Sequence, residues 1–371
     1  MVKTLNVFAL LIVSFSINGQ EKIKSSHNHP YSALYAKREI IRLDKNMNGF
    51  IEKSESKQKW KRLSHLDSNA DEKLSLLEYS NIEIPKLETK GTKKLNIVYK
   101  TTQEEDLYLD IYYPNLPTNN KLPVVFYTHG GGWVVGSKEN IVNPLMKVHF
   151  LELLMEGFAV VSINYRLVDR ERVAMRDCII DAIDALHYLS KHKSILGLET
   201  DQVFVMGDSA GGQIAQMLTL ADANLFFGEP FLKSYTYKVK AGISWYGPTD
   251  FTKTELFKTS DYTKNPDRFG DRIFKKGMDR FKKEFYYKEV SPVFYLTSQS
   301  SPLLIMAAEN DTTIPVAHAF HMKNKAEQVQ ANVEVFIVKN SGHNWRSVSG
   351  DLVDLKAIRR KTVDFFLEQL D

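Results

Sequence analysis

The chain contains 371 residues, of which 43% are hydrophobic and 25% are charged. This composition is typical of a globular protein that buries a large core, as two domains or as one large domain with an appendage. The formal net charge is only +4, and no basic stripe is interleaved with aromatic residues, which argues against nucleic-acid binding.

The first 19 residues have the pattern of a secretory signal peptide. Lys3 precedes an apolar run over residues 7–13, and the small residue Gly19 stands at the expected cleavage site. An apolar run this short does not comfortably cross a bilayer; an uncleaved membrane anchor is the alternative interpretation. The signal peptide predicts an exported protein, periplasmic or secreted. Because no second long apolar run follows, we expect no membrane segment after signal removal.

Cys178 is the only cysteine, so the chain can form no internal disulfide. It lies among Met175, Ile179 and Ile183 on a helical pattern. We therefore expect a buried structural thiol rather than a nucleophile.

Residues 20–30 are polar and are interpreted as a linker. A helical pattern over residues 32–43 then leads into a twelve-residue segment from Asp44 to Glu55. Oxygen-bearing side chains stand at its positions 1, 3 and 5, glycine at 6 and glutamate at 12, which is the pattern of an EF-hand loop. The predicted calcium ligands are Asp44, Asn46, Asn48, the carbonyl of Phe50, Glu52 and Glu55.

A second loop of this kind begins 23 residues after the first and runs from Asp67 to Glu78. Its predicted ligands are Asp67, Asn69, Asp71, the carbonyl of Lys73, Ser75 and Glu78. Glu72 stands where glycine is expected, and the positive φ needed there costs another residue roughly 1–2 kcal/mol. We therefore expect the second site to be weaker or its loop relaxed.

Ile51 and Leu74 occupy matching positions and predict a short two-stranded ribbon between the loops. We interpret residues 31–84 as an EF-hand pair in which calcium has a structural or tethering role. The pair resembles the EF-hand modules of exported bacterial proteins more than a calmodulin-type sensor. The alternative is that two acidic turns cap helices by chance.

After a polar connection, residues 85–95, buried apolar strands alternate with helices. Strands are expected at 95–99, 107–113, 123–127, 158–163, 203–206, 241–246, 303–307 and 333–338, and helices at 148–156, 171–191, 212–221, 316–327 and 352–370. This alternation implies an α/β domain over residues 96–371, with a mostly parallel central sheet flanked by helices.

Three successive glycines, Gly130 to Gly132, follow the strand expected at 123–127. Glycines let a backbone approach a ligand closely and turn its N–H groups inward. His129 precedes them and is interpreted as a residue that shapes the turn. The alternative is a flexible strand-to-helix connection.

The strand expected at 203–206 runs into Gly207-Asp-Ser209-Ala-Gly211 and then into a helix. This context exposes a serine as a nucleophile, and the helix N-terminus behind it favours developing negative charge. We therefore expect the N–H groups of Gly131, Gly132 and Ala210 to form an oxyanion hole, in which the loss of one donor costs about 3 kcal/mol of barrier.

A nucleophilic serine needs a base, and the base needs an orienting acid. His343 follows the last β-rich run and lies on a loop at the same sheet edge as Ser209, whereas the other nine histidines are worse placed. Asp311 follows the strand expected at 303–307 and keeps the chain order Ser, Asp, His. Asp250, after the preceding strand, is the rival acid but is interpreted as a helix cap.

These motifs make the chain from about residue 96 to its end resemble the α/β-hydrolase esterases with an HGGG-type oxyanion loop. The resemblance rests on His129-Gly-Gly-Gly-Trp133, Asn164-Tyr-Arg-Leu167, Gly207-Asp-Ser-Ala-Gly211, Tyr246-Gly-Pro-Thr-Asp250, Glu309-Asn-Asp311 and Ser341-Gly-His343. The set is similar to the carbohydrate-esterase-like branch, which includes feruloyl and acetyl-xylan esterases, beside the hormone-sensitive-lipase-like branch. The resemblance implies that residues 251–287 form a cap or insertion near the acyl pocket.

The combined expectation is an exported serine carboxylic-ester hydrolase that acts through an acyl-enzyme on short acyl or feruloyl esters of carbohydrates. No cofactor is expected for the chemistry; calcium belongs to the N-terminal module. One alternative is an arylformamidase-like enzyme that uses the same triad on an amide or formamide. The other is a calcium-dependent binding protein with a disused hydrolase fold. The sequence indicates no oligomeric state, and export would suit a plant or algal polysaccharide ester as the substrate.

Overall fold

The computed structural model describes residues 30–116, 121–226, 228–348, 350 and 352–370. The expected signal peptide, residues 1–19, and the linker up to residue 29 lie outside the described residues. Among the described residues, no helix has the length and apolar character needed to cross a membrane.

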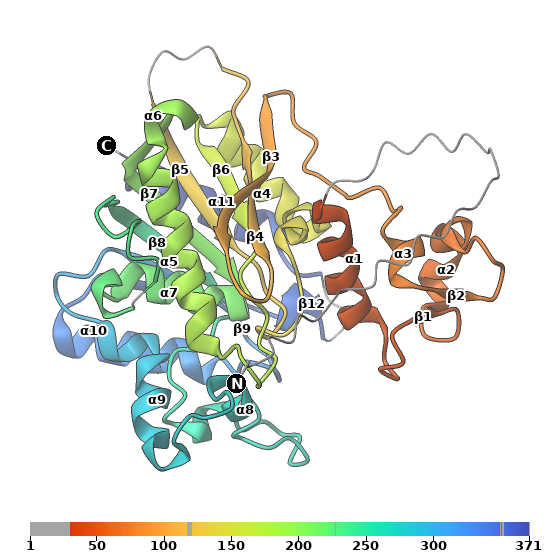
Figure 1. Ribbon diagram of the computed structural model, residues 1–371. Coiled ribbons are helices and arrows are strands. Elements are labelled where there is room, and N and C mark those ends of the chain that lie inside the picture. The colour runs from red at the N-terminus through yellow and green to blue at the C-terminus, as the bar shows by residue number, and fades with distance from the viewer. Residues whose placement is uncertain (1–29, 117–120, 227, 349, 351, 371) are drawn as a thin grey trace, which may run out of the picture.

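The expected strands assemble into one eight-stranded sheet (Figure 1). The pairs from β10 to β6 are parallel, whereas β4 pairs antiparallel with both β6 and β3. The mostly parallel α/β sheet expected from the sequence is confirmed. In spatial order the strands are β10 (Val333–Val338), β9 (Leu303–Ala308), β8 (Val239–Trp245), β7 (Leu198–Asp208), β5 (Leu122–Thr128), β6 (Ala159–Ile163), β4 (Asp106–Tyr112) and β3 (Lys93–Thr101).

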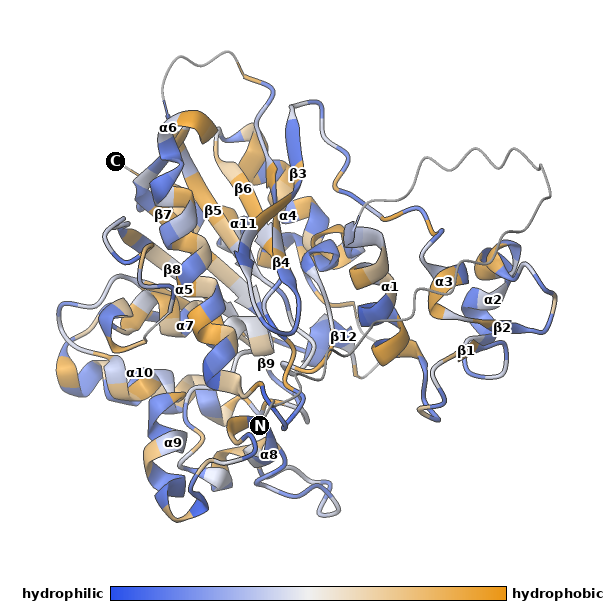
Figure 2. Cartoon of the chain, in the orientation of Figure 1, coloured by the Kyte–Doolittle hydropathy of each residue, from blue (hydrophilic) through white to orange (hydrophobic). Residues whose placement is uncertain are grey.

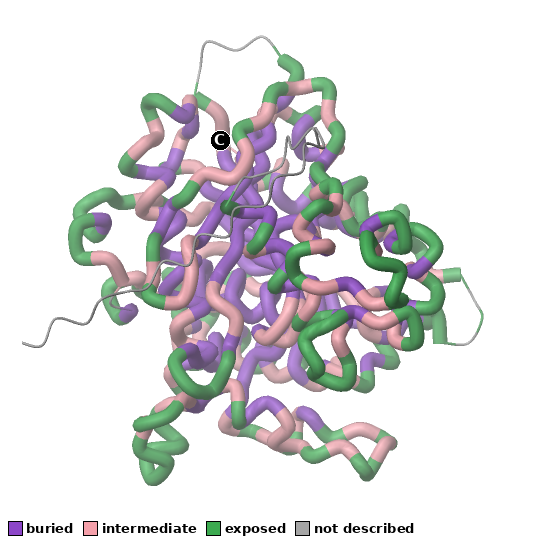
Figure 3. Tube along the Cα trace, turned by 45° about the vertical axis from the view of Figure 1, so that its right-hand side comes forward, coloured by how far each residue is buried: buried purple, intermediate pink, exposed green. Residues whose placement is uncertain are grey.

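Helices cover both faces of this sheet, and the sheet with its helices is called the body below. Alternate residues of one strand face the two layers: in β5, Val124 and Phe126 pack on the side of α5 and α7, and Val125 and Tyr127 on the side of α4 and α11. Figure 2 shows hydrophobic strands between helices of mixed character, and Figure 3 shows the buried residues concentrated along the sheet. The helices are α4 (Pro144–Met155), α5 (Met175–Lys191), α6 (Lys193–Leu196), α7 (Ala210–Leu220), α10 (Ala317–Val329) and α11 (Leu355–Leu367).

The start of α5 differs from the sequence expectation, which placed it at Glu171. The carboxylate of Asp169 accepts the N–H groups of Glu171, Arg172 and Val173 at 2.8–3.0 Å and holds them in a turn. Such local side-chain bonds compete with the helix. The helix therefore begins only at Met175.

The N-terminal module contains two loops, residues 44–55 and 67–78, each leading into a short helix. It consists of α1 (Pro30–Leu43), β1 (Ile51–Glu52), α2 (Lys57–Leu63), β2 (Lys73–Leu74) and α3 (Leu76–Tyr79). Ile51 pairs with Leu74 in an antiparallel ribbon, as expected. Gly49 and Glu72 both have positive φ, 87° and 61°, so the second loop adopts the strained conformation despite its glutamate.

The first helix of this module packs directly on the body (Figure 1). The guanidinium of Arg38, 2% exposed, donates to the carbonyl oxygens of Tyr165 (2.9 Å) and Gly136 (3.2 Å) and pairs with Glu105 at 2.9 Å. The hydroxyl of Tyr31 donates to the carboxylate of Glu139 at 2.6 Å. Helix α1 is therefore attached to the segment that follows the three glycines.

Residues 251–287, the expected insertion, lie between β8 and β9 and contain α8 (Gly270–Ile273) and most of α9 (Lys283–Glu289). The ring of Trp133, directly after the glycines, packs edge-on against Phe251 at 5.8 Å and Phe269 at 5.7 Å between centroids. The insertion therefore contacts the glycine loop. A two-residue ribbon, β11 (Ser341–Gly342) and β12 (Arg346–Ser347), completes the set of strands.

Candidate active site

Ser209 lies in a sharp turn between β7 and α7. Its φ is 52° and its ψ −114°, and its N–H donates to the carbonyl of Trp245 at 2.8 Å. A Cβ added to Gly207 would lie 2.2 Å from the carbonyl oxygen of Gly211, and one added to Gly211 would lie 2.0 Å from that of Thr128. The turn therefore requires both glycines, and it leaves Ser209 half-buried at the carboxyl edge of the sheet.

His343 connects Ser209 to Asp311. Its Nε2 lies 3.0 Å from Oγ of Ser209, and its Nδ1 lies 2.7 Å from Oδ2 of Asp311. Oδ1 of the buried Asp311 accepts the N–H groups of Thr313 (2.7 Å) and Ile314 (2.9 Å), which fixes the carboxylate in place. The structure thus brings together the three side chains expected from sequence, each after the carboxyl end of a parallel strand.

Asp250, the rival acid, has other partners. Its Oδ2 lies 2.9 Å from Nε2 of His321, and its Oδ1 accepts both the O–H (2.6 Å) and the N–H (2.9 Å) of Thr252. No hydrogen bond between the described residues joins Asp250 to His343. The geometry therefore favours Asp311 as the partner of His343.

The glycine loop presents free N–H groups. Gly131 and Gly132 have positive φ, 125° and 59°, and a Cβ on Gly131 would lie 2.0 Å from the carbonyl oxygen of Val135. Neither N–H donates a hydrogen bond to any part of the chain that the structure describes. Ala210 begins α7, where N–H groups have no partner within the helix. All three expected oxyanion donors therefore remain available to a substrate.

His129 shapes this loop, as the sequence suggested. Its buried ring stacks on Tyr165 at 4.2 Å, and its Nδ1–H donates to the carbonyl of Gly130 at 2.8 Å. The hydroxyl of Tyr165 donates in turn to the carbonyl of His129 at 2.6 Å. Burial lowers the pKa of His129 to about 3, which makes this ring a much weaker base than an ordinary imidazole.

Asp208 also supports the glycine loop, and the sequence analysis did not identify it. Its Oδ1 accepts the hydroxyl of Tyr127 at 2.8 Å and the N–H of Gly130 at 2.9 Å. Burial raises the pKa of this carboxyl, while the two hydrogen bonds act against that rise. In the sequence, only its position next to Ser209 pointed to a role for Asp208. Its two partners, Tyr127 and Gly130, are 81 and 78 residues away along the chain.

An aromatic pair positions the other side of the site. The ring of Tyr246 lies 4.7 Å from that of His343, and the ring of Trp345 packs edge-on against Tyr246 at 4.6 Å. Both aromatic rings are buried. They restrict the rotation of the imidazole and keep it in line with Ser209.

Comparison with known proteins places this chain in a family. A family model described as BD-FAE matches residues 109–326, more than half of the chain. The chain belongs to the BD-FAE family. The match includes the glycine loop, Ser209 and Asp311, whereas the EF-hand-like loops and His343 lie outside it.

Several relatives of this BD-FAE protein have curated names. It is 30% identical over 230 residues to Probable carboxylic ester hydrolase LipM of Mycobacterium tuberculosis, covering 62% of this chain and 51% of LipM. It is 25% identical over 277 residues to Probable carboxylesterase 7 of Arabidopsis thaliana, covering 71% and 83%. The chain spans about half the length of LipM and of Esterase LipQ of the same bacterium, of which it covers 50%.

Solved esterases share the fold. The esterase Est2 of Thermogutta terrifontis superposes with a TM-score of 0.59 at 20% identity, covering 75% of this chain and 91% of Est2. A truncated carbohydrate esterase from gut microbiota gives a TM-score of 0.61 at 20% identity, covering 77% and 99%. The body of this BD-FAE protein therefore has the α/β-hydrolase fold expected from the sequence.

The two N-terminal loops share one hydrogen-bond pattern. Asp44 accepts the N–H groups of Asn48 (3.2 Å) and Gly49 (2.7 Å), as Asp67 accepts those of Asp71 (3.2 Å) and Glu72 (3.0 Å). Asn46, Asn48, Asn69 and Asp71 each accept the N–H group two residues ahead. Glu55 and Glu78 reach back across their loops to the N–H groups of Lys45 and Ser68. The side-chain oxygens at positions 1, 3, 5 and 12 of each loop thus accept hydrogen bonds from the backbone of the same loop.

The donor set of the loops consists of hard oxygens, which suits calcium. Hydrogen bonds from the backbone and hydroxyl of Ser75 lower the pKa of Glu78 to about 2, so this carboxylate is charged at neutral pH. Glu52 is 3.1 Å from the ammonium of Lys73 in the other loop. Within the described residues, no group of three or more His, Cys, Asp or Glu side chains is arranged to hold a metal ion. Amide, hydroxyl and carbonyl oxygens would therefore have to supply part of each site.

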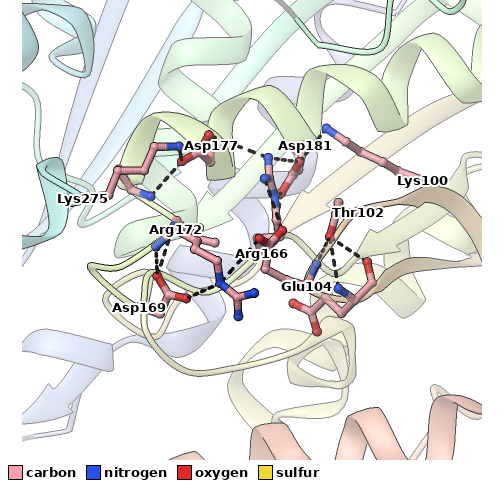
Figure 4. A network of polar contacts seen from close by, with 12 residues as sticks. Lys100, Thr102, Glu104, Arg166, Asp169, Arg172, Asp177, Asp181 and Lys275 are labelled. Carbon is pink, nitrogen blue, oxygen red and sulfur yellow. Dashed lines mark hydrogen bonds and ion pairs between the residues drawn. The ribbon is translucent and has the colours of Figure 1, made fainter. Parts of the chain in front are cut away.

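A cavity of about 660 Å³ lies away from Ser209 and is lined by Lys100, Glu104, Arg166, Arg172, Asp177 and Lys275, among others. Figure 4 shows that these charges pair with one another. Arg166 donates to both oxygens of Asp181 at 2.8 and 2.9 Å, and Lys275 pairs with Asp177 at 2.8 Å. We interpret this network as structural, because its cations already have carboxylate partners.

Proposed function

We propose that this protein is a serine carboxylic-ester hydrolase that acts through an acyl-enzyme. The observation that carries the proposal is the pair of hydrogen bonds, 3.0 and 2.7 Å, that joins Ser209 through His343 to Asp311. Membership of the BD-FAE family and the ester-hydrolase names of the relatives support it.

In this proposal each group of the site has one role. Because the carboxylate of Asp311 can only accept, Nδ1 of His343 carries the proton and Nε2 is free to take the proton of Ser209. The serine oxygen then attacks the ester carbonyl. The oxyanion forms hydrogen bonds with the N–H groups of Gly131, Gly132 and Ala210, which stabilise charge that develops in the transition state. His343 returns its proton to the leaving alcohol and then activates the water that hydrolyses the acyl-enzyme.

The same proposal extends to substrate and location. We propose short acyl or feruloyl esters of carbohydrates as substrates of an exported, periplasmic or secreted enzyme. The signal-peptide pattern of residues 1–19 and the structural likeness to a carbohydrate esterase support this extension. Release of acetate from acetylated xylan, or of ferulate from feruloyl oligosaccharides, would support it; activity on 4-nitrophenyl esters alone would contradict it. Faster turnover of N-formylkynurenine than of any ester would favour a formamidase.

The assignment of Asp311 to the triad can be tested by comparing it with Asp250, the rival acid. Asp311→Asn should lower kcat about 10⁴-fold, because an amide cannot hold the required tautomer of His343. Asp250→Asn, the matched change in the rival acid, should leave kcat within about tenfold of the wild type. Labelling of Ser209 by a fluorophosphonate, absent in Ser209→Ala, provides an independent readout. Equal losses in the two aspartate variants would contradict the assignment.

We further propose that residues 31–84 bind calcium with a structural role. The shared hydrogen-bond pattern and the oxygen donor set of both loops support this proposal. Calcium would neutralise the loop carboxylates, chiefly Asp44, Glu55, Asp67 and Glu78. In the full chain, calcium should raise the unfolding temperature and chelator should lower it, without a change in initial rate. The double variant Glu55→Gln/Glu78→Gln should lose both the titration heat and the thermal shift; no heat with the wild type would contradict the proposal.

A further inference from the structure

Arg272 lies against the glycine loop from the side of the insertion. Its Nη1 is 3.0 Å and its Cζ 3.5 Å from the point where a Cβ on Gly132 would stand. The guanidinium also stacks on the ring of Phe269, 4.8 Å from the centroid, and this ring packs against Trp133, the residue after Gly132. Arg272 is thus fixed beside one of the expected oxyanion donors.

This guanidinium has no counter-charge among the residues that the structure describes. Within the described part of the chain, Arg272 forms no ion pair and its guanidinium donates no hydrogen bond. Its neighbour Asp271 points instead to Arg170, 3.8 Å away. Burial, followed by repulsion from Arg170 and Arg268, lowers the pKa of Arg272. Arg170 and Arg268 are therefore close enough to Arg272 for their positive charges to repel its own.

The other two arginines of this group are engaged. Arg268 donates to the carbonyl oxygens of Phe257 (2.8 Å) and Thr313 (2.6 Å), which ties it to the loop that holds Asp311. Arg170 is largely exposed and forms an ion pair with Asp271. Of the three arginines, Arg272 is therefore the one that is half-buried, lacks a partner among the described residues and contacts the glycine loop.

An unpaired cation in a partly dry site is unfavourable unless a ligand completes it. Stacking on Phe269 holds the plane of the Arg272 guanidinium, but it leaves the N–H donors of that group without an acceptor among the described residues. A guanidinium presents a planar fork of donors that matches a carboxylate with two parallel hydrogen bonds. The ligand that fits is thus a carboxylate held close to the reacting carbonyl.

We infer that Arg272 recognises a carboxylate on the substrate, so that the preferred esters carry a negative charge a few bonds from the ester group. Acidic sugars and dicarboxylic half-esters belong to this class. The inference rests on the proposed ester hydrolysis at Ser209 and specifies the substrate of that site. Arg272 is a specificity-determining residue here, and the three N–H groups still stabilise the oxyanion.

Two probe pairs test the inference on the full-length protein. On the alcohol side, 3-acetoxybenzoate is compared with its neutral methyl ester; on the acyl side, 4-nitrophenyl hydrogen adipate is compared with 4-nitrophenyl hexanoate. The wild type should favour the charged member of at least one pair in kcat/KM, chiefly through KM. This preference should weaken as salt is added, because the attraction is electrostatic.

Arg272→Gln should lower kcat/KM about 10- to 100-fold for the charged probe and less than about threefold for the neutral one. Arg272→Lys, which keeps the charge but not the fork, should restore part of the preference. Arg280→Gln is the matched control: Arg280 lies in the same insertion and stacks on Phe274 at 5.0 Å, but it is exposed. It should change neither probe.

The outcomes separate this inference from the proposed function. Hydrolysis of both members of each pair without discrimination, or an equal loss for both in Arg272→Gln, would overturn the role of Arg272 and leave the esterase proposal intact. Absence of hydrolysis together with absence of fluorophosphonate labelling at Ser209 would overturn both.

Discussion

Replacement of Arg38 by methionine should destabilise the protein by about 3 kcal/mol. Arg38 joins α1 to the body through the carbonyls of Tyr165 and Gly136 and through Glu105, at 2.9, 3.2 and 2.9 Å. Loss of one partner of a buried ion pair costs about 3–5 kcal/mol. Because 14% of the side-chain surface of Glu105 is exposed, water relieves part of its charge, and the lower end of that range applies.

Urea denaturation of the full chain measures this change. Lys37→Met is the matched control, because Lys37 precedes Arg38 on the same helix and is exposed; a surface substitution usually changes stability by less than about 0.5 kcal/mol. The arginine variant should also be cleaved faster by trypsin at the exposed Lys86, which follows the module. If the two variants differ by less than about 1 kcal/mol, α1 is not tied to the body as strongly as its contacts indicate.

Two further perturbations probe buried groups. Tyr127→Phe removes one hydrogen bond from the carboxylate of Asp208, which should cost about 1–3 kcal/mol in urea denaturation; unchanged stability would contradict a stabilising role for this bond. Burial lowers the pKa values of His129, His149 and His318 to about 3, 4 and 3, from an unfolded value of about 6.5. Their stabilising contribution is complete above pH 6.5 and is lost progressively below it, so unfolding free energy should fall by about 2 kcal/mol per histidine between pH 7 and 5. A stability that is flat over this interval would contradict their burial as neutral rings.

The strands and the geometry of the candidate site followed from local sequence patterns. Each strand expected in the body appears within five residues of its predicted bounds, because a short apolar run bounded by turn residues is too short for a typical helix and fits a buried strand. Ser209, Asp311 and His343 each follow such a run directly. Their meeting is then a consequence of parallel strands, whose carboxyl ends share one edge.

Contacts between residues far apart in the chain could not be predicted from local sequence patterns. Arg38 and its partners are separated by 67, 98 and 127 residues, and no periodicity links them. Arg272 is one of several basic residues in a polar segment, and only the fold shows that it touches Gly132. Helix α5 starts late because the carboxylate of Asp169 accepts hydrogen bonds from three N–H groups that would otherwise belong to the helix. The spacing of apolar residues gives no information about such a hydrogen bond.

Residues from several separate segments of the chain form hydrogen bonds with the glycine loop, so these segments and the loop pack as one unit. Asp208 fixes the N–H of Gly130 from the serine turn, and Tyr165 fixes the carbonyl of His129 from the end of β6. Arg38 of α1 fixes the carbonyl of Gly136, and a Cβ on Gly136 would lie 2.6 Å from both His129 Nδ1 and the carbonyl oxygen of Gly130. Preorganised donors act only if their backbone does not move during the reaction. Helix α1 therefore supports the same loop as the serine turn does, although its sequence belongs to the module that precedes the body.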